Sequence, residues 1–155
     1  MSLIFLFISC NEKNQAVQKK KGENKSITVG FSIDTLAIER WQRDLDVFMA
    51  AVRDLDAQVI VQNAGNSVEE QKRQLTYLMD RNVDVIVILP KDAASLVEEI
   101  EKIRAKNIPV ISYDRLILNT DVVPSVSVDS TTVGFLLGQQ MQSVSGTKNW
   151  LCILG

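Results

Sequence analysis

From residue 26 onward, short runs of apolar, β-branched residues alternate with longer segments whose apolar residues recur at helical spacing. The runs cover residues 27–33, 58–62, 83–89, 110–113, 125–128 and 151–154, and the helical segments cover residues 38–55, 68–81, 93–106 and 131–143. Helices of this length between strands are typical of βαβ units and a parallel sheet. The runs consist largely of Val and Ile, which indicates strands buried on both faces. We therefore predict an α/β fold with a doubly wound parallel sheet.

Several polar residues mark where the predicted helices begin. Ser67 stands three residues before Glu70, which is the spacing of a capping box. Asp92 and Ser130 occupy the positions at which an N-cap is expected. Pro109 ends the third helix and precedes the fourth strand.

The composition narrows the classes of function. The chain has 155 residues, of which 46% are apolar, enough for one substantial core, and its net charge of -2 gives no electrostatic footprint for nucleic acid. It contains no histidine, so catalysis or metal binding by histidine is excluded in this segment. Its cysteines, Cys10 and Cys152, match no zinc or redox spacing, and we expect no disulfide between them. We predict no catalytic residue, no metal and no cofactor, and a neutral small molecule as the partner.

The N-terminus resembles an export signal. Residues 1–8 form an apolar block too short to span a bilayer, and Ser9 and Cys10 follow it at once. This order resembles the lipobox of bacterial lipoproteins, with Phe7 where Leu is usual and without a basic region before it. We expect acylation of Cys10, with residues 11–25 as a flexible tether that holds the domain at a membrane. The alternative is a frayed apolar end with an incidental cysteine.

In an open parallel sheet, ligands bind beyond the carboxyl ends of the strands. The residues at these positions are Asp34, Asn63, Pro90, and Asp114 with Arg115. An adjacent carboxylate and guanidinium suit a polyol, because a hydroxyl group both donates and accepts hydrogen bonds. The alternative for Asp114 and Arg115 is an exposed ion pair that contributes about 0 to 1 kcal/mol.

A second group of polar residues follows the first predicted strand. Arg40 lies on the first helical turn, where it can donate to a ligand oxygen. Trp41 either offers a ring face to a ligand or wedges the helix against the core, and packing is the usual role of such a Trp. Glu39 and Arg43 form an i,i+4 pair typical of an exposed helix, and Asp34 either contacts ligand or caps the helix.

Four strings in the chain resemble the first half of periplasmic sugar-binding proteins of the ribose, galactose and xylose type, above all those that bind D-xylose. They are residues 38–44 (IERWQRD), residues 83–90 (VDVIVILP), Tyr113-Asp114-Arg115, and Val128-Asp129 ahead of Val133-Gly134. In that family the matching Arg of the first loop and the Asp-Arg pair after the fourth strand bind the sugar. The resemblance therefore implies Arg40, Asp114 and Arg115 as sugar-binding residues, with Asp34 and Trp41 as secondary candidates.

The resemblance also implies a domain plan of two lobes that close over one sugar. On this plan, residues 1–10 are a partial signal peptide with the lipobox, residues 11–25 the tether and residues 26–128 the N-terminal sugar-binding lobe. Residues 129–155 are then the hinge and the start of a second lobe, which the sequence leaves incomplete. The second-lobe contacts of the family would lie beyond Gly155, and Trp150 is expected to pack rather than to stack on sugar.

The function implied is that of an extracytoplasmic receptor, in the periplasm or at the cell surface, that delivers a pentose, with D-xylose first, to an ABC permease. A sugar sensor that signals to a membrane sensor histidine kinase would use the same residues. A sugar-responsive transcription regulator would need a helix-turn-helix ahead of the first strand, and residues 11–25 contain none. A Rossmann-type enzyme would need a glycine-rich loop after that strand, but no glycine follows Gly30 there.

Overall fold

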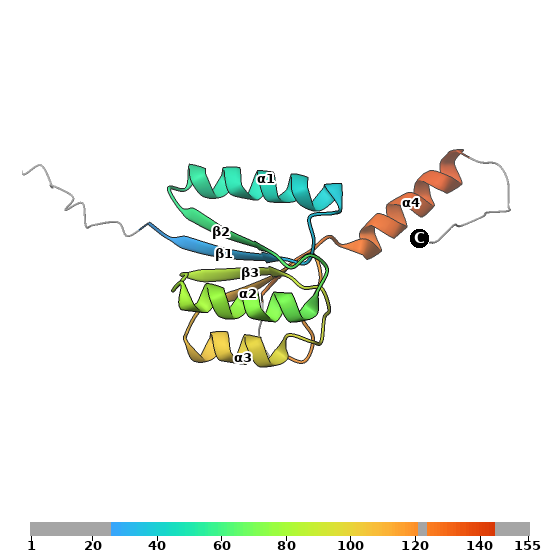
Figure 1. Cartoon of the computed structure of the whole chain (residues 1–155). Coiled ribbons are helices and arrows are strands. Elements are labelled where there is room, and N and C mark those ends of the chain that lie inside the picture. Colours follow the sequence, from blue (N-terminus) through green and yellow to red (C-terminus); the bar gives the residue numbers. More distant parts are fainter. Residues whose placement is uncertain (1–25, 121–123, 145–155) are drawn as a thin grey trace, which may run out of the picture.

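The computed structural model describes residues 26–120 and 124–144 (Figure 1). In these residues a parallel sheet has the strand order β2-β1-β3-β4-β5. Its strands are β1 (Thr28–Ile33), β2 (Gln58–Asn63), β3 (Val85–Leu89), β4 (Val110–Tyr113) and β5 (Ser125–Val126). The helices are α1 (Glu39–Asp54), α2 (Val68–Asp80), α3 (Val97–Ala105) and α4 (Ser130–Val144). Helix α1 covers one face of the sheet, whereas α2 and α3 cover the other (Figure 1), which confirms the predicted doubly wound α/β fold.

The central strands β1 and β3 are mostly apolar because both of their faces are buried. On the α1 face, Val29 and Phe31 of β1 pack with Leu45 of α1. On the opposite face, Ile86 and Ile88 of β3 join a cluster with residues of α2 and α3. Side chains alternate between the two faces of a strand, so a strand covered on both sides carries apolar residues at successive positions. This arrangement explains the Val- and Ile-rich runs of the sequence.

Gly30 lets helix α2 approach the sheet closely. A Cβ atom at this position would lie 3.0 Å from both Cδ atoms of Leu78, which is fully buried. Most side chains at position 30 would therefore push α2 away from β1.

The first turn of α2 follows the prediction in part. The Ser67 hydroxyl accepts a hydrogen bond from the backbone N–H of Glu70 at 3.2 Å, as an N-cap should. The other half of the capping box is replaced, because the Glu70 carboxylate pairs with Arg73 and Gln74.

Two predicted N-caps are wrong. The Asp92 carboxylate accepts hydrogen bonds from the N–H groups of Ala94 (3.0 Å) and Ser95 (2.8 Å) and so stabilises a separate turn, and α3 begins only at Val97. Ser130 is already helical, and the carboxylate of Asp129 instead accepts bonds from the first free N–H groups of α4. In both cases an aspartate satisfied the nearest free donors of the backbone.

Helix α4 projects away from the sheet (Figure 1), and all of its residues are exposed. Its apolar side chains include Phe135, which is 64% exposed, and Leu137, which is 60% exposed. The apolar side chains of α4 therefore form a face without packing partners among the described residues.

The predicted signal segment, lipobox and tether and the last predicted strand, residues 151–154, lie outside the described residues, as do Cys10, Trp150 and Cys152. Among the residues that the structure describes, no helix is both long and apolar enough to cross a membrane. The same residues contain no cluster of three or more Cys, Asp or Glu side chains that could hold a metal ion.

Candidate functional site

The ends of three neighbouring strands bring the predicted polar residues together. Asp34 follows β1, Pro90 follows β3, and Asp114 and Arg115 follow β4, while Arg40 lies on the first turn of α1. Because β1, β3 and β4 are parallel and adjacent, their carboxyl ends meet at one edge of the sheet. The structure therefore places the predicted residues in one region.

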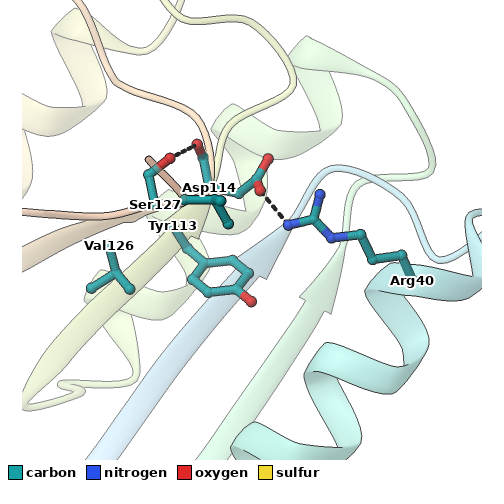
Figure 2. Close-up of a pocket in the computed structure, with 6 residues that line it drawn as sticks. Arg40, Tyr113, Asp114, Val126 and Ser127 are labelled. Carbon is teal, nitrogen blue, oxygen red and sulfur yellow. Dashed lines mark hydrogen bonds and ion pairs between the residues drawn. The ribbon is translucent and has the colours of Figure 1, made fainter. Parts of the chain in front are cut away.

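Arg40 and Asp114 form an ion pair between α1 and the end of β4. The Arg40 Nη2 atom lies 2.5 Å from Oδ1 of Asp114 (Figure 2), and its Nε atom lies 3.6 Å from Oδ2 of Asp44. The Arg40 side chain is 50% exposed, so the pair with Asp114 contributes about 0 to 1 kcal/mol to stability. A ligand can bridge or replace this contact at little cost.

The backbone around Asp114 fixes its position. Asp114 has a φ of 61°, a left-handed conformation that aspartate tolerates better than most residues. Its N–H donates to the carbonyl of Val126 at 2.8 Å, and its carbonyl accepts from the Ser127 hydroxyl at 2.9 Å (Figure 2). The carboxylate consequently sits at a rigid corner between β4 and β5.

Arg115 and Asp114 are adjacent in the sequence but form hydrogen bonds with different residues. Its Nη1 atom donates to Oδ2 of Asp34 at 2.5 Å and to the carbonyl of Pro90 at 2.9 Å. The predicted alternative, in which Asp34 caps the first helix, is wrong, because Ile38 occupies the N-cap of α1 and no side chain bonds to the turn there. The alternative of a simple ion pair between Asp114 and Arg115 is also wrong, since each pairs with another residue.

Trp41 packs in the core, as expected for a tryptophan on a helix. It is 4% exposed and contacts Ile33 and Leu89 at the strand ends. The guanidinium carbon of Arg40 lies 4.4 Å from the centroid of the Trp41 ring, and that of Arg115 lies 5.7 Å from it. Cation–π attraction to one indole ring keeps the two arginines near each other despite their like charge.

A cavity of about 130 Å³ opens beside the Arg40–Asp114 pair. Its lining combines two charged groups, an aromatic ring, a hydroxyl and apolar carbon from β5 and the residues after it (Figure 2): Arg40, Tyr113, Asp114, Val126, Ser127 and Val128. Such a wall can hydrogen-bond hydroxyl groups and cover C–H groups of one small ligand.

Sequence reasoning missed the roles of Asp44 and Tyr113. The Tyr113 hydroxyl donates to Oδ2 of Asp44 at 2.9 Å, and burial, followed by this hydrogen bond, raises the pKa of Tyr113. The signal for Asp44 was present, because Asp44 follows Arg40 by four residues and thus lies on the same side of the helix. For Tyr113 the strand pattern indicated burial but not a hydrogen bond.

Comparison with known proteins identifies the class to which this fold and site belong. The model of the periplasmic binding protein domain family matches residues 29–155. The chain therefore belongs to that family.

Among individual proteins, the chain is similar to the D-xylose-binding periplasmic protein of Haemophilus influenzae, with 34% identity over 139 residues. The match covers 90% of this chain but 42% of that relative, so the chain spans about two fifths of the relative's length.

Two solved structures are also similar to the chain. The carbohydrate transporter solute-binding protein of Chloroflexus aurantiacus, in complex with D-glucose, aligns with a TM-score of 0.72 and 32% identity over 81% of this chain and 37% of its own. The fructose-binding periplasmic domain of a hybrid two-component system aligns with a TM-score of 0.63 and 25% identity over 76% and 39% of the two chains.

Proposed function

We propose that the protein is an extracytoplasmic solute-binding protein that captures a pentose, with D-xylose first, for uptake by an ABC transporter. In this proposal residues 26–128 form the N-terminal lobe, and residues 129–155 form the hinge and the start of a second lobe. Arg40, Asp114 and Arg115 bind the sugar. The observation that carries the proposal is the convergence of these three side chains at the carboxyl ends of β1, β3 and β4, the edge at which open parallel sheets bind ligands.

The charges of the site favour a neutral ligand. The two guanidinium groups of Arg40 and Arg115 face three carboxylates, because Asp114 and Asp34 each pair with one of them and Asp44 lies 3.6 Å from Arg40. A phosphate or carboxylate ligand would find no uncompensated cation, whereas a sugar hydroxyl can donate to an aspartate and accept from an arginine. The Haemophilus influenzae relative with 34% identity is a D-xylose-binding protein, which supports this sugar as the first to test.

The mechanism we propose is closure of two lobes over the sugar. A ligand that contacts both lobes stabilises the closed state by the difference between its affinities for the closed and open states. The cavity of about 130 Å³ is smaller than the roughly 300 Å³ at which ligand pockets usually begin. This size suits one wall of a site that a second lobe completes.

A sensor function is the alternative. The similarity to a fructose-binding domain of a two-component system favours it, and the recognition residues would be the same. Loss of D-xylose uptake on deletion of the gene would support transport, whereas loss of sugar-dependent transcription with normal uptake would support sensing.

We also propose a lipid anchor at Cys10, followed by the tether of residues 11–25, which would keep the protein at the outer face of a membrane. Incorporation of a labelled fatty acid that is lost in Cys10→Ser tests this anchor.

Isothermal titration tests the main proposal. The protein expressed from the complete gene is titrated with D-xylose, D-ribose, L-arabinose and D-glucose. We expect a pentose to bind most tightly, and the double variant Asp114→Asn, Arg115→Ala to bind it about 100-fold or more weakly, since it loses two charge-assisted bonds of about 1.5 to 3 kcal/mol each.

The matched control is Glu39→Gln, Arg43→Ala, which likewise removes one carboxylate and one guanidinium, but from an exposed ion pair on α1. It should leave the affinity unchanged. Absence of binding to every sugar of the panel would refute the proposed function.

A further inference from the structure

Asp34 is a buried carboxylate with one strong partner. Its side chain is 2% exposed, Oδ2 accepts from Nη1 of Arg115 at 2.5 Å, and Oδ1 has no partner among the described residues. Burial of a carboxylate costs several kcal/mol unless it is paired. The Arg115 guanidinium is therefore the group that keeps Asp34 in place, and the dependence is mutual.

Arg115 is held at one nitrogen only. Its two acceptors, the carboxylate of Asp34 after β1 and the carbonyl of Pro90 after β3, both bind Nη1. No other described residue accepts a hydrogen bond from its Nε or Nη2 atoms. The guanidinium is planar and rigid, so fixing Nη1 from two neighbouring strand ends also fixes where Nε and Nη2 lie. Two sets of N–H donors remain for a ligand.

The Arg40–Asp114 pair offers a contrast. The Arg40 side chain is 50% exposed and that of Asp114 is 18% exposed, whereas Asp34 is almost completely buried. Solvent can compete for Arg40 and Asp114 but hardly for Asp34. The Arg40–Asp114 pair can therefore open for a ligand, whereas the Arg115–Asp34 pair belongs to the scaffold of the site.

From this geometry we propose that Asp34 is a positioning residue of the sugar site. It does not touch the sugar, and it holds the Arg115 guanidinium in one orientation so that Nε and Nη2 are ready to donate to sugar oxygens. Preorganised donors bind more tightly because their rotamer freedom is already lost before the ligand arrives. The inference rests on the proposed function and assigns Asp34 a role other than ligand contact or helix cap.

The test is a double-mutant cycle on the protein expressed from the complete gene, with D-xylose affinity measured by isothermal titration up to millimolar sugar. Asp34→Asn keeps the size of the side chain and one acceptor but removes the charge. We expect its Kd for D-xylose to rise about tenfold, because a charge-assisted bond is about twice as strong as a neutral one. In the Arg115→Ala background, the same substitution should change Kd less than about twofold.

Asp84→Asn is the matched control. Asp84 accepts from the N–H of Thr28 at 2.8 Å, at the opposite end of β1. This variant should lower the unfolding midpoint without changing Kd. If Asp34→Asn does not fold, Asp34→Ser takes its place in the cycle.

The possible outcomes separate the two proposals. Wild-type protein that binds sugar, together with an unchanged Kd in Asp34→Asn, overturns the positioning role alone. An equal loss of affinity from Asp34→Asn with and without Arg115 also overturns it, since the carboxylate would then contact the sugar directly. Wild-type protein that binds no sugar overturns the proposed function, and the positioning role with it.

Discussion

Gln71 is the polar side chain on which the loop beneath the site depends. It is fully buried on α2, and its Nε2 atom donates to the Ser32 hydroxyl at 3.1 Å and to the Leu89 carbonyl at 2.9 Å. Its Oε1 atom accepts from the N–H of Lys91 at 2.8 Å. The amide thus holds the residues on both sides of Pro90, whose carbonyl binds Arg115. We predict that Gln71→Leu destabilises the fold strongly.

The magnitude follows from the groups that lose their partner. The Leu89 carbonyl is left without its partner in a buried position, which costs about 1 to 3 kcal/mol. The Lys91 N–H also loses its acceptor, but it is part-buried and therefore adds about 1 kcal/mol. The Ser32 hydroxyl can rotate to another acceptor and adds little. We therefore expect a loss of about 2 to 4 kcal/mol, a large part of the roughly 5 to 15 kcal/mol that stabilises a domain.

Gln74→Leu is a matched control on the same helix. Gln74 is 7% exposed, and its Nε2 atom donates to the Asn63 carbonyl at 2.9 Å and to Oε1 of Glu70 at 3.1 Å. Its Oε1 atom already has no partner among the described residues. Its loss should cost about 1 kcal/mol.

Urea unfolding of both variants, with equal m-values, gives the two changes in the free energy of unfolding. If Gln71→Leu is no more destabilising than Gln74→Leu, the reasoning about this network is wrong.

Two further predictions concern local interactions. The raised pKa of Tyr113 means that its neutral form is favoured in the fold, so this stabilisation holds below its ordinary value of 10.0 and is lost as pH rises through the folded value. Subtracting the tyrosinate absorbance of Tyr113→Phe from that of the wild type should give a midpoint above 10.0, and a midpoint at or below it would contradict the burial and the bond to Asp44. Ser67→Ala should cost about 1 kcal/mol in urea unfolding because the N–H of Glu70 loses its cap, whereas no change would show that water replaces the hydroxyl.

The order of elements could be predicted because the central strands β1 and β3 are buried on both faces. Strands with Val and Ile at successive positions, separated by helices of sufficient length, leave few topologies other than a parallel sheet. The boundaries were less certain where side chains compete with the helix for backbone donors. Asp92 illustrates this, since its carboxylate takes the N–H groups of Ala94 and Ser95 and delays α3 to Val97.

The location of the site could also be predicted from the sequence, but which carboxylate pairs with which arginine could not. The topology alone places the residues that follow adjacent parallel strands at one edge of the sheet. Which carboxylate meets which guanidinium depends on the packing of helix α1 and on the corner at Asp114. Arg40 and Asp114 are 74 residues apart, and Asp34 and Arg115 are 81 residues apart, so no local spacing indicates either pair. The sequence also did not indicate the buried hydrogen bonds of Gln71, because a glutamine on an amphipathic helix usually faces solvent.

The central claim is that Arg40, Asp114 and Arg115 bind the hydroxyl groups of a sugar. The most direct test is a crystal structure of the protein expressed from the complete gene with D-xylose bound. We predict sugar oxygens within hydrogen-bonding distance of all three side chains, with Arg115 still bonded to Asp34 and Pro90. A sugar bound elsewhere, with Arg40 and Asp114 still paired only to each other, would contradict the account.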